Sequence, residues 1–345
     1  MNANAKRICI TPRVSGVGGM VSFAAKLSAG LAARGIQVTY DLGDQPYDGV
    51  LVIGGTRKLV ALRRARRSGL PIVQRLDGMN WLHRRTPTGA RHWLRAELAN
   101  WLLAYIRERL ATQVVYQSHF VQDWWKSTHR MGPESHTVIH NGVDLKQFNP
   151  QGSETPPRDR IRILMVEGSL QGGYELGLQS AVALAEAVQV ELSKNVELAV
   201  AGKTEEDLKD KWTQKSRVRI EWAGVVPNGN IPALNRGAHL LYSADLNAAC
   251  PNSVIEALAC GLPVLAFDTG ALKELVPPQA GRLAPYGGDP WKLDPPNIKG
   301  LVSGAVELIQ TQAAFRKGAR TRAEAAFGLE AMVDAYIQAL GGAGG

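Results

Sequence analysis

Short runs of β-branched and aliphatic residues alternate with helical stretches along the first half of the chain. These runs predict strands at residues 7–11, 37–41, 49–53, 71–75, 113–116 and 137–140. Between the first two runs, apolar residues recur every four positions at Phe23, Leu27 and Leu31, and Gly35 follows as a stop signal. This spacing predicts an amphipathic helix. Strand, helix and strand in short alternation predict a parallel sheet with crossover helices.

A polar, proline-rich segment at residues 150–160 interrupts this series and is typical of an interdomain linker. A second alternating series follows, with strands predicted at residues 161–166, 196–201, 218–222, 239–243 and 263–267. We therefore expect an α/β fold of two doubly wound, Rossmann-like domains that face a central cleft, where ligands of open α/β sheets bind. The expected domains are residues 1–150 and 151–325, followed by a helical segment at 326–345.

The composition is that of a soluble globular protein, with 45% hydrophobic and 21% charged residues in a chain of 345. No apolar run approaches the roughly 20 residues that cross a bilayer. The N-terminus enters a predicted strand at once and lacks the long apolar core of a signal peptide, so we expect a cytoplasmic protein. Cys9, Cys250 and Cys260 have no metal-ligand spacing. Their odd number argues against a disulfide framework, and we interpret the last two as packing residues.

The net charge of +9 is concentrated in one part of the chain. Residues 57–109 hold thirteen lysines and arginines against three acidic residues, a local net charge of +10. Three tryptophans lie in the same stretch: Trp81, Trp93 and Trp101. Such a surface suits an anionic partner, which could be a membrane surface, a lipid phosphate or a nucleic acid. The alternative is a solvated face on two helices.

The most informative stretch begins at residue 247 and reads NAACPNSVIEALACGLPVLAFDTGALKELV. A turn-rich loop leads into a short helix, whose first backbone N–H groups belong to Asn252, Ser253 and Val254. Unpaired N–H groups and the positive end of the helix dipole predict a phosphate site there. Glu256 lies one turn further, where its carboxylate could accept hydrogen bonds from ribose hydroxyls. Alternatively, Ser253 and Glu256 form a capping box.

The segment EALACGLPV, which starts at Glu256, resembles the strongest signature of the retaining GT-B glycosyltransferases of family four, also called glycosyl transferases group 1. In that signature a Glu, seven residues and a second Glu precede Ala-x-Ala-Cys-Gly-x-Pro-Val. The resemblance implies a GT-B fold and a role for Glu256 in binding the donor ribose. Ala248 stands where the family has its first Glu, near the donor sugar. Asp245 and Asn247 are the nearest candidates to replace it.

Other resemblances extend over nearly the whole chain. The run GVGGM, which starts at Gly16, is similar to the family's glycine-rich loop, which faces the donor phosphates and the acceptor; Gly18 and Gly19 are therefore candidate site residues. A tight strand-to-helix turn would also favour glycine. VIHNGVDLKQFNP, from Val138, is similar to the segment that closes the family's first domain. AFGLEAMVDAYIQAL, from Ala326, resembles the last helix, which crosses back to the first domain; on its own it is an amphipathic helix.

Two positions depart from the family pattern. The family carries an Arg and a Lys after the first strand of the second domain, where they neutralise the donor diphosphate. The segment GSLQGGY, which starts at Gly168, has Ser169 and Tyr174 in their places. The backbone N–H groups of this loop could still face an anion. Lys203, at the end of the next predicted strand, is the nearest cation, unless it is an ordinary surface lysine.

The second departure follows the fourth predicted strand of the first domain. The family usually has a histidine there, and this chain has Asp77. A carboxylate that faces the cleft could orient or deprotonate an acceptor hydroxyl. The alternative is a turn residue before Gly78.

These observations predict the retaining transfer of a hexose from a nucleoside diphosphate sugar to a hydroxyl of a glycan or lipid-linked glycan, with peripheral contact to an anionic membrane. Backbone N–H groups, the glycine loop and Lys203 would stabilise the leaving diphosphate. The sequence has no P-loop, zinc spacing or Asp-x-Asp motif, and no metal or cofactor is expected. One alternative is a non-catalytic relative that binds a nucleotide or glycan. Another is a nucleic-acid-binding protein, but the basic stretch lacks a reader motif, and we expect no nucleic-acid partner.

Overall fold

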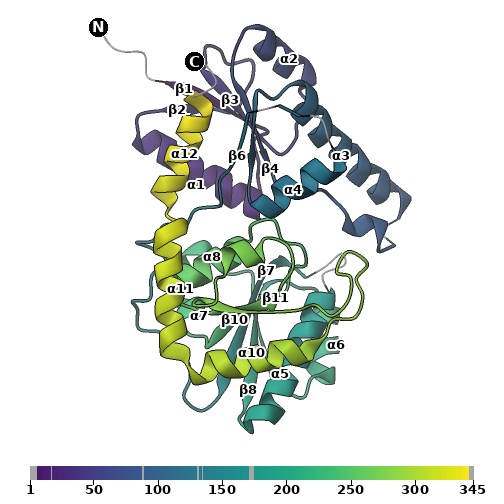
Figure 1. Ribbon diagram of the computed structural model, residues 1–345, viewed down its shortest axis with the longest axis vertical. Helices are drawn as coiled ribbons and strands as arrows, with labels where there is room; N and C mark the ends of the chain where they lie inside the picture. The colour runs from purple at the N-terminus through teal and green to yellow at the C-terminus, as the bar shows by residue number, and fades with distance from the viewer. Residues whose placement is uncertain are drawn as a thin grey trace. The chain divides into compact units, whose positions relative to one another are not determined.

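The computed structural model describes residues 6–16, 18–87, 89–129, 132–133, 135–170 and 175–341. These residues form two compact units. The first takes in the described residues up to Gly142 and those from Leu329 onward, and the second is Val143–Gly328. Each unit contains a six-stranded parallel sheet with helices on its faces (Figure 1). The predicted α/β class with two doubly wound sheets is confirmed.

The first sheet has the strand order β2-β1-β3-β4-β5-β6. Its strands are β1 (Arg7–Thr11), β2 (Gln37–Thr39), β3 (Gly49–Ile53), β4 (Ile72–Leu76), β5 (Gln113–Tyr116) and β6 (His136–Val138). All residues of β3 and β4 are buried. A parallel sheet covered on both faces favours such continuous runs over alternation.

Helices cover both faces of this sheet. One face packs against α1 (Gly19–Ala33) and α12 (Leu329–Gly341), and the other against α2 (Leu59–Arg67) and α3 (Ala90–Arg109). A further helix, α4 (His119–Thr128), contacts β5. The rings of Phe23 in α1 and Tyr336 in α12 lie 5.1 Å apart. The last helix of the chain therefore completes the core of the first unit (Figure 1).

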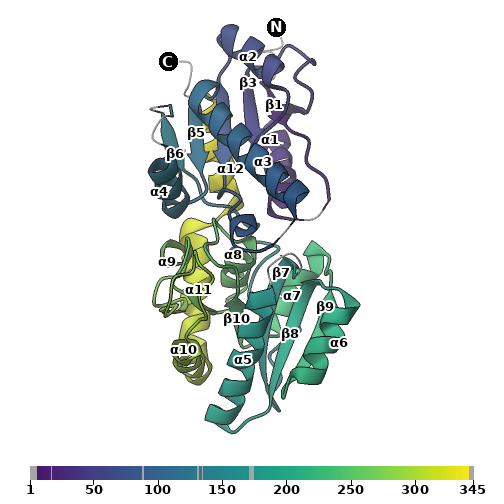
Figure 2. The same ribbon diagram turned by 90° about the vertical axis from the view of Figure 1, so that its right-hand side faces the viewer.

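The second sheet has the strand order β12-β11-β10-β7-β8-β9. Its strands are β7 (Ile161–Ser169), β8 (Val196–Lys203), β9 (Arg219–Gly224), β10 (Leu240–Ser243), β11 (Val264–Phe267) and β12 (Gly281–Ala284). The helices α5 (Glu175–Leu192) and α10 (Ile298–Gln310) share one core with the sheet. Helix α8 (Asn252–Ala259) packs on β10 and β11. Two further helices, α7 (Ile231–Arg236) and α11 (Gln312–Ala326), pack against α8. The helix α6 (Glu206–Lys215) lies beside β9 (Figure 2).

Strand order reverses at one point in each sheet. In the second sheet, β8 and β9 lie on one side of β7, whereas β10, β11 and β12 lie on the other. In the first sheet the reversal falls between β1 and β3. Ligands of doubly wound sheets bind beyond the carboxyl ends of the strands at such a point. The residues after β1, β7 and β10 are therefore placed for binding.

The structure contains one strand, β12, that the sequence did not predict. It also shows which unit contains the polar segment at residues 150–160. The strand β12 reads GRLA, and its glycine and arginine interrupt the apolar run that would have marked it. The segment 150–160 lies in the second unit, where Glu154 pairs with Arg236 at 2.9 Å. The chain passes from the first unit to the second after Gly142.

The contact of α12 with α1 gives a test of the first unit. Tyr336 is fully buried. Tyr336→Ala removes an aromatic ring from the core and should lower the free energy of unfolding by about 3–5 kcal/mol. Hydrogen exchange should accelerate in β1 and β3, but not in β7 and β8. Tyr336→Phe keeps the ring and serves as the control. Equal acceleration in both sheets would contradict a local role for α12.

Candidate active site

The start of α8 presents backbone donors at the carboxyl edge of the second sheet. The helix begins at Asn252, after Pro251 as N-cap, and no side chain caps it. Ser253 is therefore inside the helix, and the capping-box alternative is wrong. The first N–H groups of a helix have no acceptor within it. Those of Asn252, Ser253 and Val254 are thus placed to bind an anion, as the sequence predicts.

Glu256 lies one turn into the same helix and is 6% exposed. Its neighbours Val254, Ile255, Ala257 and Leu258 are buried aliphatic side chains. Burying a carboxylate among such residues costs free energy, and positions of this kind are concentrated at functional sites. Glu256 thus lies close to the uncapped helix start, and its ribose role stays a prediction.

Lys203 lies beside the loop that lacks the family's two cations. Ser169 at the end of β7 is the register partner of Lys203 at the end of β8, and Leu170 N–H donates to Lys203 O at 3.0 Å. Gly168 and Lys203 are both exposed. The structure therefore brings Gly168, Ser169 and Lys203 together at the carboxyl ends of two adjacent strands. Residues 171–174, which include Tyr174, lie outside the described residues.

The position of the family's first Glu is filled by tightly packed backbone. Ala248 is buried, and its carbonyl accepts a hydrogen bond of 2.9 Å from Ala271 N–H. Gly270, with a φ of +61°, approaches so closely that a Cβ there would lie 2.5 Å from Ala248 N. Asn247 has a φ of 57° in the left-handed region, and its buried side-chain nitrogen has no partner among the described residues. The position of Ala248 itself therefore offers no acidic side chain.

Two carboxyl groups meet at the reversal point of the second sheet. Glu167 lies near the end of β7, and Asp245 follows β10, the adjacent strand. Burial raises the pKa of Glu167 to about 8, and the negative charge of Asp245 adds to the increase. Burial also raises the pKa of Asp245, to about 6. Neither carboxylate forms a salt bridge within the described part of the chain, so the pair holds a proton near neutral pH.

Glu167 is the site residue that our sequence interpretation missed. A signal was present, because the glutamate directly follows the apolar run ILMV, at the carboxyl end of a predicted strand. From the sequence, Asp245 is a candidate only as a substitute for the missing first Glu. Its pairing with Glu167 depends on the crossover that places β10 beside β7, and a single sequence does not specify that order.

In the first unit, Asp77 follows β4 beside a buried arginine. Burial raises the pKa of the Asp77 carboxyl, and the positive charge of Arg75 opposes the increase. The Arg75 guanidinium lies 3.8 Å from the ring centroid of Phe23 and donates to Asn141 Oδ1 at 2.8 Å. The backbone carbonyl of Asp77 accepts from Trp125 Nε1 at 2.8 Å. Asp77 is therefore both a fixed turn residue and a carboxylate beside a cation.

The glycine loop of the first unit requires glycine for conformational reasons. Gly18 is the N-cap of α1, with a φ of +138°, and Gly16 has a φ of +98°. No atom lies within 4 Å of a Cβ built at either residue, so backbone strain rather than steric exclusion selects glycine. Gly19 is the first residue of α1. Val17 lies outside the described residues.

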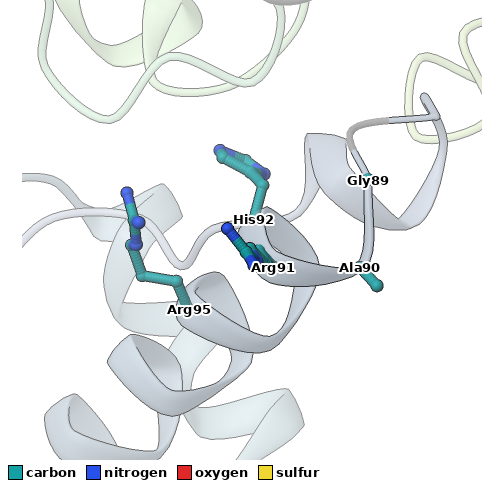
Figure 3. Close-up of a pocket in the computed structure, with 5 residues that line it drawn as sticks. All are labelled: Gly89, Ala90, Arg91, His92 and Arg95. Atoms are coloured by element: carbon teal, nitrogen blue, oxygen red, sulfur yellow. The ribbon is translucent and has the colours of Figure 1, made fainter.

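The basic stretch maps mainly to α2 and α3. Trp93 and Trp101 are exposed, whereas Trp81 is partly buried. A hollow of about 460 Å³ at the start of α3 is lined by Gly89, Ala90, Arg91, His92 and Arg95. Figure 3 shows the side chains of His92 and Arg95 projecting from the same side of this helix. Among the described residues, no helix is long and apolar enough to span a membrane, and no three acidic, histidine or cysteine side chains gather as metal ligands would.

Comparison with protein families matches residues 163–309, the segment from β7 to α10, to the glycosyl transferases group 1. This segment, which is less than half of the chain and lies in the second unit, is similar to that family. A curated relative from Arabidopsis thaliana, one of the subunits of phosphatidylinositol N-acetylglucosaminyltransferase, is 25% identical over 186 residues. The match covers 52% of this chain and 38% of the relative. The chain thus spans well under half the length of that protein.

Solved structures show the GT-B fold across both units. A sucrose-phosphate synthase from Thermosynechococcus elongatus matches with a TM-score of 0.74 at 15% identity, over 96% of this chain and 98% of its own. WaaG, a glycosyltransferase of lipopolysaccharide biosynthesis, matches with a TM-score of 0.73 at 13% identity, over 97% of this chain and 100% of its own. Anabaena HepE in complex with UDP and glucose matches with a TM-score of 0.67 at 16% identity, over 98% of this chain and 100% of its own. The predicted GT-B fold is confirmed.

The Glu167–Asp245 pair predicts a pH dependence of stability. A raised carboxyl pKa means that the folded protein holds a proton that the unfolded chain has already lost. The free energy of unfolding should therefore fall as the pH rises from about 5 to about 8. Glu167→Gln imitates the neutral acid and should be more stable than the native protein near pH 8 and similar to it near pH 5. Urea unfolding at both values measures this.

The matched control is Glu191→Gln, which changes an exposed carboxylate at the end of α5. This variant should follow the native pH dependence. If Glu167→Gln and the native protein lose stability in parallel between the two pH values, the proton is not held by this pair.

Proposed function

We propose that the chain is a retaining glycosyltransferase that moves a hexose from a nucleoside diphosphate sugar to a hydroxyl acceptor. The observation that carries the proposal is the uncapped start of α8 with the buried Glu256 one turn behind it. Backbone N–H groups and the helix dipole suit a diphosphate, and a carboxylate suits the paired hydroxyls of ribose. The similarity of residues 163–309 to the glycosyl transferases group 1 supports the same assignment, as does the similarity to HepE, whose structure was solved with UDP and glucose.

In the proposed reaction, bond breaking at the anomeric carbon leaves negative charge on the departing diphosphate. Fixed donors that meet this charge as it develops lower the barrier. The N–H groups of Ser253 and Val254 and the ammonium group of Lys203 are the proposed donors in the second unit. A protonated Glu167–Asp245 pair would spare the diphosphate the repulsion of two carboxylates. Gly18, Gly19 and Asp77 are the proposed acceptor-side residues, with Asp77 orienting the acceptor hydroxyl.

The proposed acceptor is a hydroxyl of a glycan or lipid-linked glycan, at a membrane surface on the cytoplasmic side. The exposed arginines and tryptophans of α2 and α3 support this choice. The names of two similar proteins point the same way, WaaG of lipopolysaccharide biosynthesis and the plant phosphatidylinositol N-acetylglucosaminyltransferase. The cysteines Cys9, Cys250 and Cys260 are buried and not joined in disulfides, which suits a reducing compartment.

A non-catalytic protein that binds a nucleotide or glycan is the second candidate. The packed backbone around Ala248 favours it, because no carboxylate stands at the family's first Glu. The two candidates share donor binding and differ in turnover. A thermal-shift screen against nucleoside diphosphates and their sugars therefore tests donor binding, since a ligand at 100 times its Kd adds about 2.7 kcal/mol to stability. Release of the nucleoside diphosphate from the sugar that binds then tests transfer.

Glu256→Gln tests the ribose role. The change keeps the side chain's shape and removes its charge. Nucleoside diphosphate affinity should fall by roughly 1.5–3 kcal/mol, the range for a hydrogen bond to a charged group. Isothermal titration measures the loss, and circular dichroism checks that the fold is kept. Unchanged affinity would remove Glu256 from the proposed site.

Lys203→Ala tests whether this cation serves the diphosphate. Because Lys203 is exposed at a strand end, the change should leave the fold intact. Affinity for the nucleoside diphosphate should fall at least severalfold, whereas affinity for the bare nucleoside should hold. Lys194→Ala, at an exposed position before β8, is the control. Equal losses for both ligands would show that Lys203 does not contact the phosphates.

A further inference from the structure

Helix α3 has apolar side chains on two opposite faces. The face toward the sheet is buried and includes Ala96, Leu103 and Ile106. On the opposite face, Leu94, Leu98 and Trp101 are 64%, 48% and 54% exposed. A helix at the surface of a domain needs one apolar face, the one that packs on the core. The fold of the first unit therefore does not account for the second apolar face.

These three exposed residues and the partly buried Tyr105 form a continuous line, which we call the α3 stripe: Leu94, Leu98, Trp101 and Tyr105. Their spacings of four, three and four residues place them on one side of the helix, over about 16 Å. The rings of Trp101 and Tyr105 are stacked, with centroids 5.3 Å apart. Arg63 of α2 donates from Nε to the Tyr105 hydroxyl at 3.1 Å. The contact places α2 beside the end of the α3 stripe.

Unpaired cations border the α3 stripe. They are Arg91, Arg95 and Arg109 on α3 and Arg64, Arg66 and Arg67 on α2, all of them exposed. None of their guanidinium groups has a salt bridge or hydrogen bond to a described residue. Their charge is thus not neutralised within the described structure. Arg91 and Arg95 also line the hollow in Figure 3.

We propose that the α3 stripe inserts into the interface of an anionic membrane, where the bordering arginines pair with lipid phosphates. Leucine and tryptophan side chains flanked by arginines are the pattern of helices that lie in the membrane surface, and tryptophan favours that interface. A second copy of the chain fits less well, because a symmetric contact through the stripe would bring the arginines of both copies together. This membrane would carry the acceptor of the proposed transferase, so the inference rests on the proposed function.

Vesicle binding of the full chain tests the proposal without donor or turnover. The protein should co-sediment with vesicles of phosphatidylcholine and phosphatidylglycerol in equal parts, but not with phosphatidylcholine alone. Binding should weaken as salt rises. On binding, tryptophan emission should shift to shorter wavelength and should be quenched by lipids brominated in their acyl chains, because Trp101 would enter the interface.

Two sets of variants separate insertion from simple attraction. Leu94→Ser with Leu98→Ser should weaken vesicle binding about tenfold for each leucine and abolish quenching by brominated lipids. Arg91→Gln, Arg95→Gln and Arg109→Gln should weaken it about fivefold for each cation. The controls are Val190→Ser with Val225→Ser, and Lys194→Gln, Lys215→Gln and Lys299→Gln. They change exposed apolar and basic residues of the second unit and should bind as the native chain does.

Three results would overturn the proposal. The native chain could stay in the supernatant with anionic vesicles at low salt. The serine variants could bind like the native chain while the glutamine variants do not, which would indicate attraction without insertion. The native chain could form a dimer in sedimentation velocity that the serine variants abolish, which would assign the stripe to a second copy. Nucleotide affinity, measured on the same variants, should not change, so failure here is distinguishable from failure of the proposed transferase.

Discussion

The parallel direction of the strands is the constraint on which the rest of the structure depends. Each strand must be followed by a crossover, so the carboxyl ends of all strands and the starts of the following helices gather at one edge. In the second unit this edge holds the end of β7, the end of β8 and the start of α8. The unpaired N–H groups of α8 lie there because of topology, before any side chain is considered. Binding chemistry then needs only a few residues at that edge.

Buried charge distinguishes this edge from the rest of the fold. Glu256, Glu167 and Asp245 are shielded from water to different degrees, and each such carboxylate lowers stability unless it is hydrogen-bonded, paired or protonated. Glu197, by contrast, is fully buried and held by Arg160 and Arg162 at 3.0 and 2.6 Å. The carboxylate of Glu197, which has a structural role, is therefore neutralised by neighbouring arginines. A ligand with its own hydrogen-bonding groups is a physical reason to leave Glu167 and Asp245 without neighbouring cations.

Much of the fold could be predicted from the sequence because local pattern and tertiary role agree. Phe23, Leu27 and Leu31 predict the buried face of α1, and β3 is a continuous apolar run, which buried parallel strands favour. The strand β12 was missed, because four residues with a glycine and an arginine give little pattern. The site was predictable where it is local, as at Glu256 and the start of α8. The Glu167–Asp245 pair was not, since it joins residues 78 positions apart through strand order.

The two-faced character of α3 changes how the basic stretch is interpreted. In the sequence, its arginines and tryptophans allow two alternatives, a solvated face or an anchored one, because the burial of each tryptophan is unknown. The structure separates the residues by their place on the helix: Leu103 faces the core, and Leu94, Leu98 and Trp101 face outward. A solvated face explains the arginines but leaves the exposed leucines without a role. Apolar side chains and unpaired cations on one surface are together the complement of an anionic bilayer, whose phosphates lie outside its hydrocarbon.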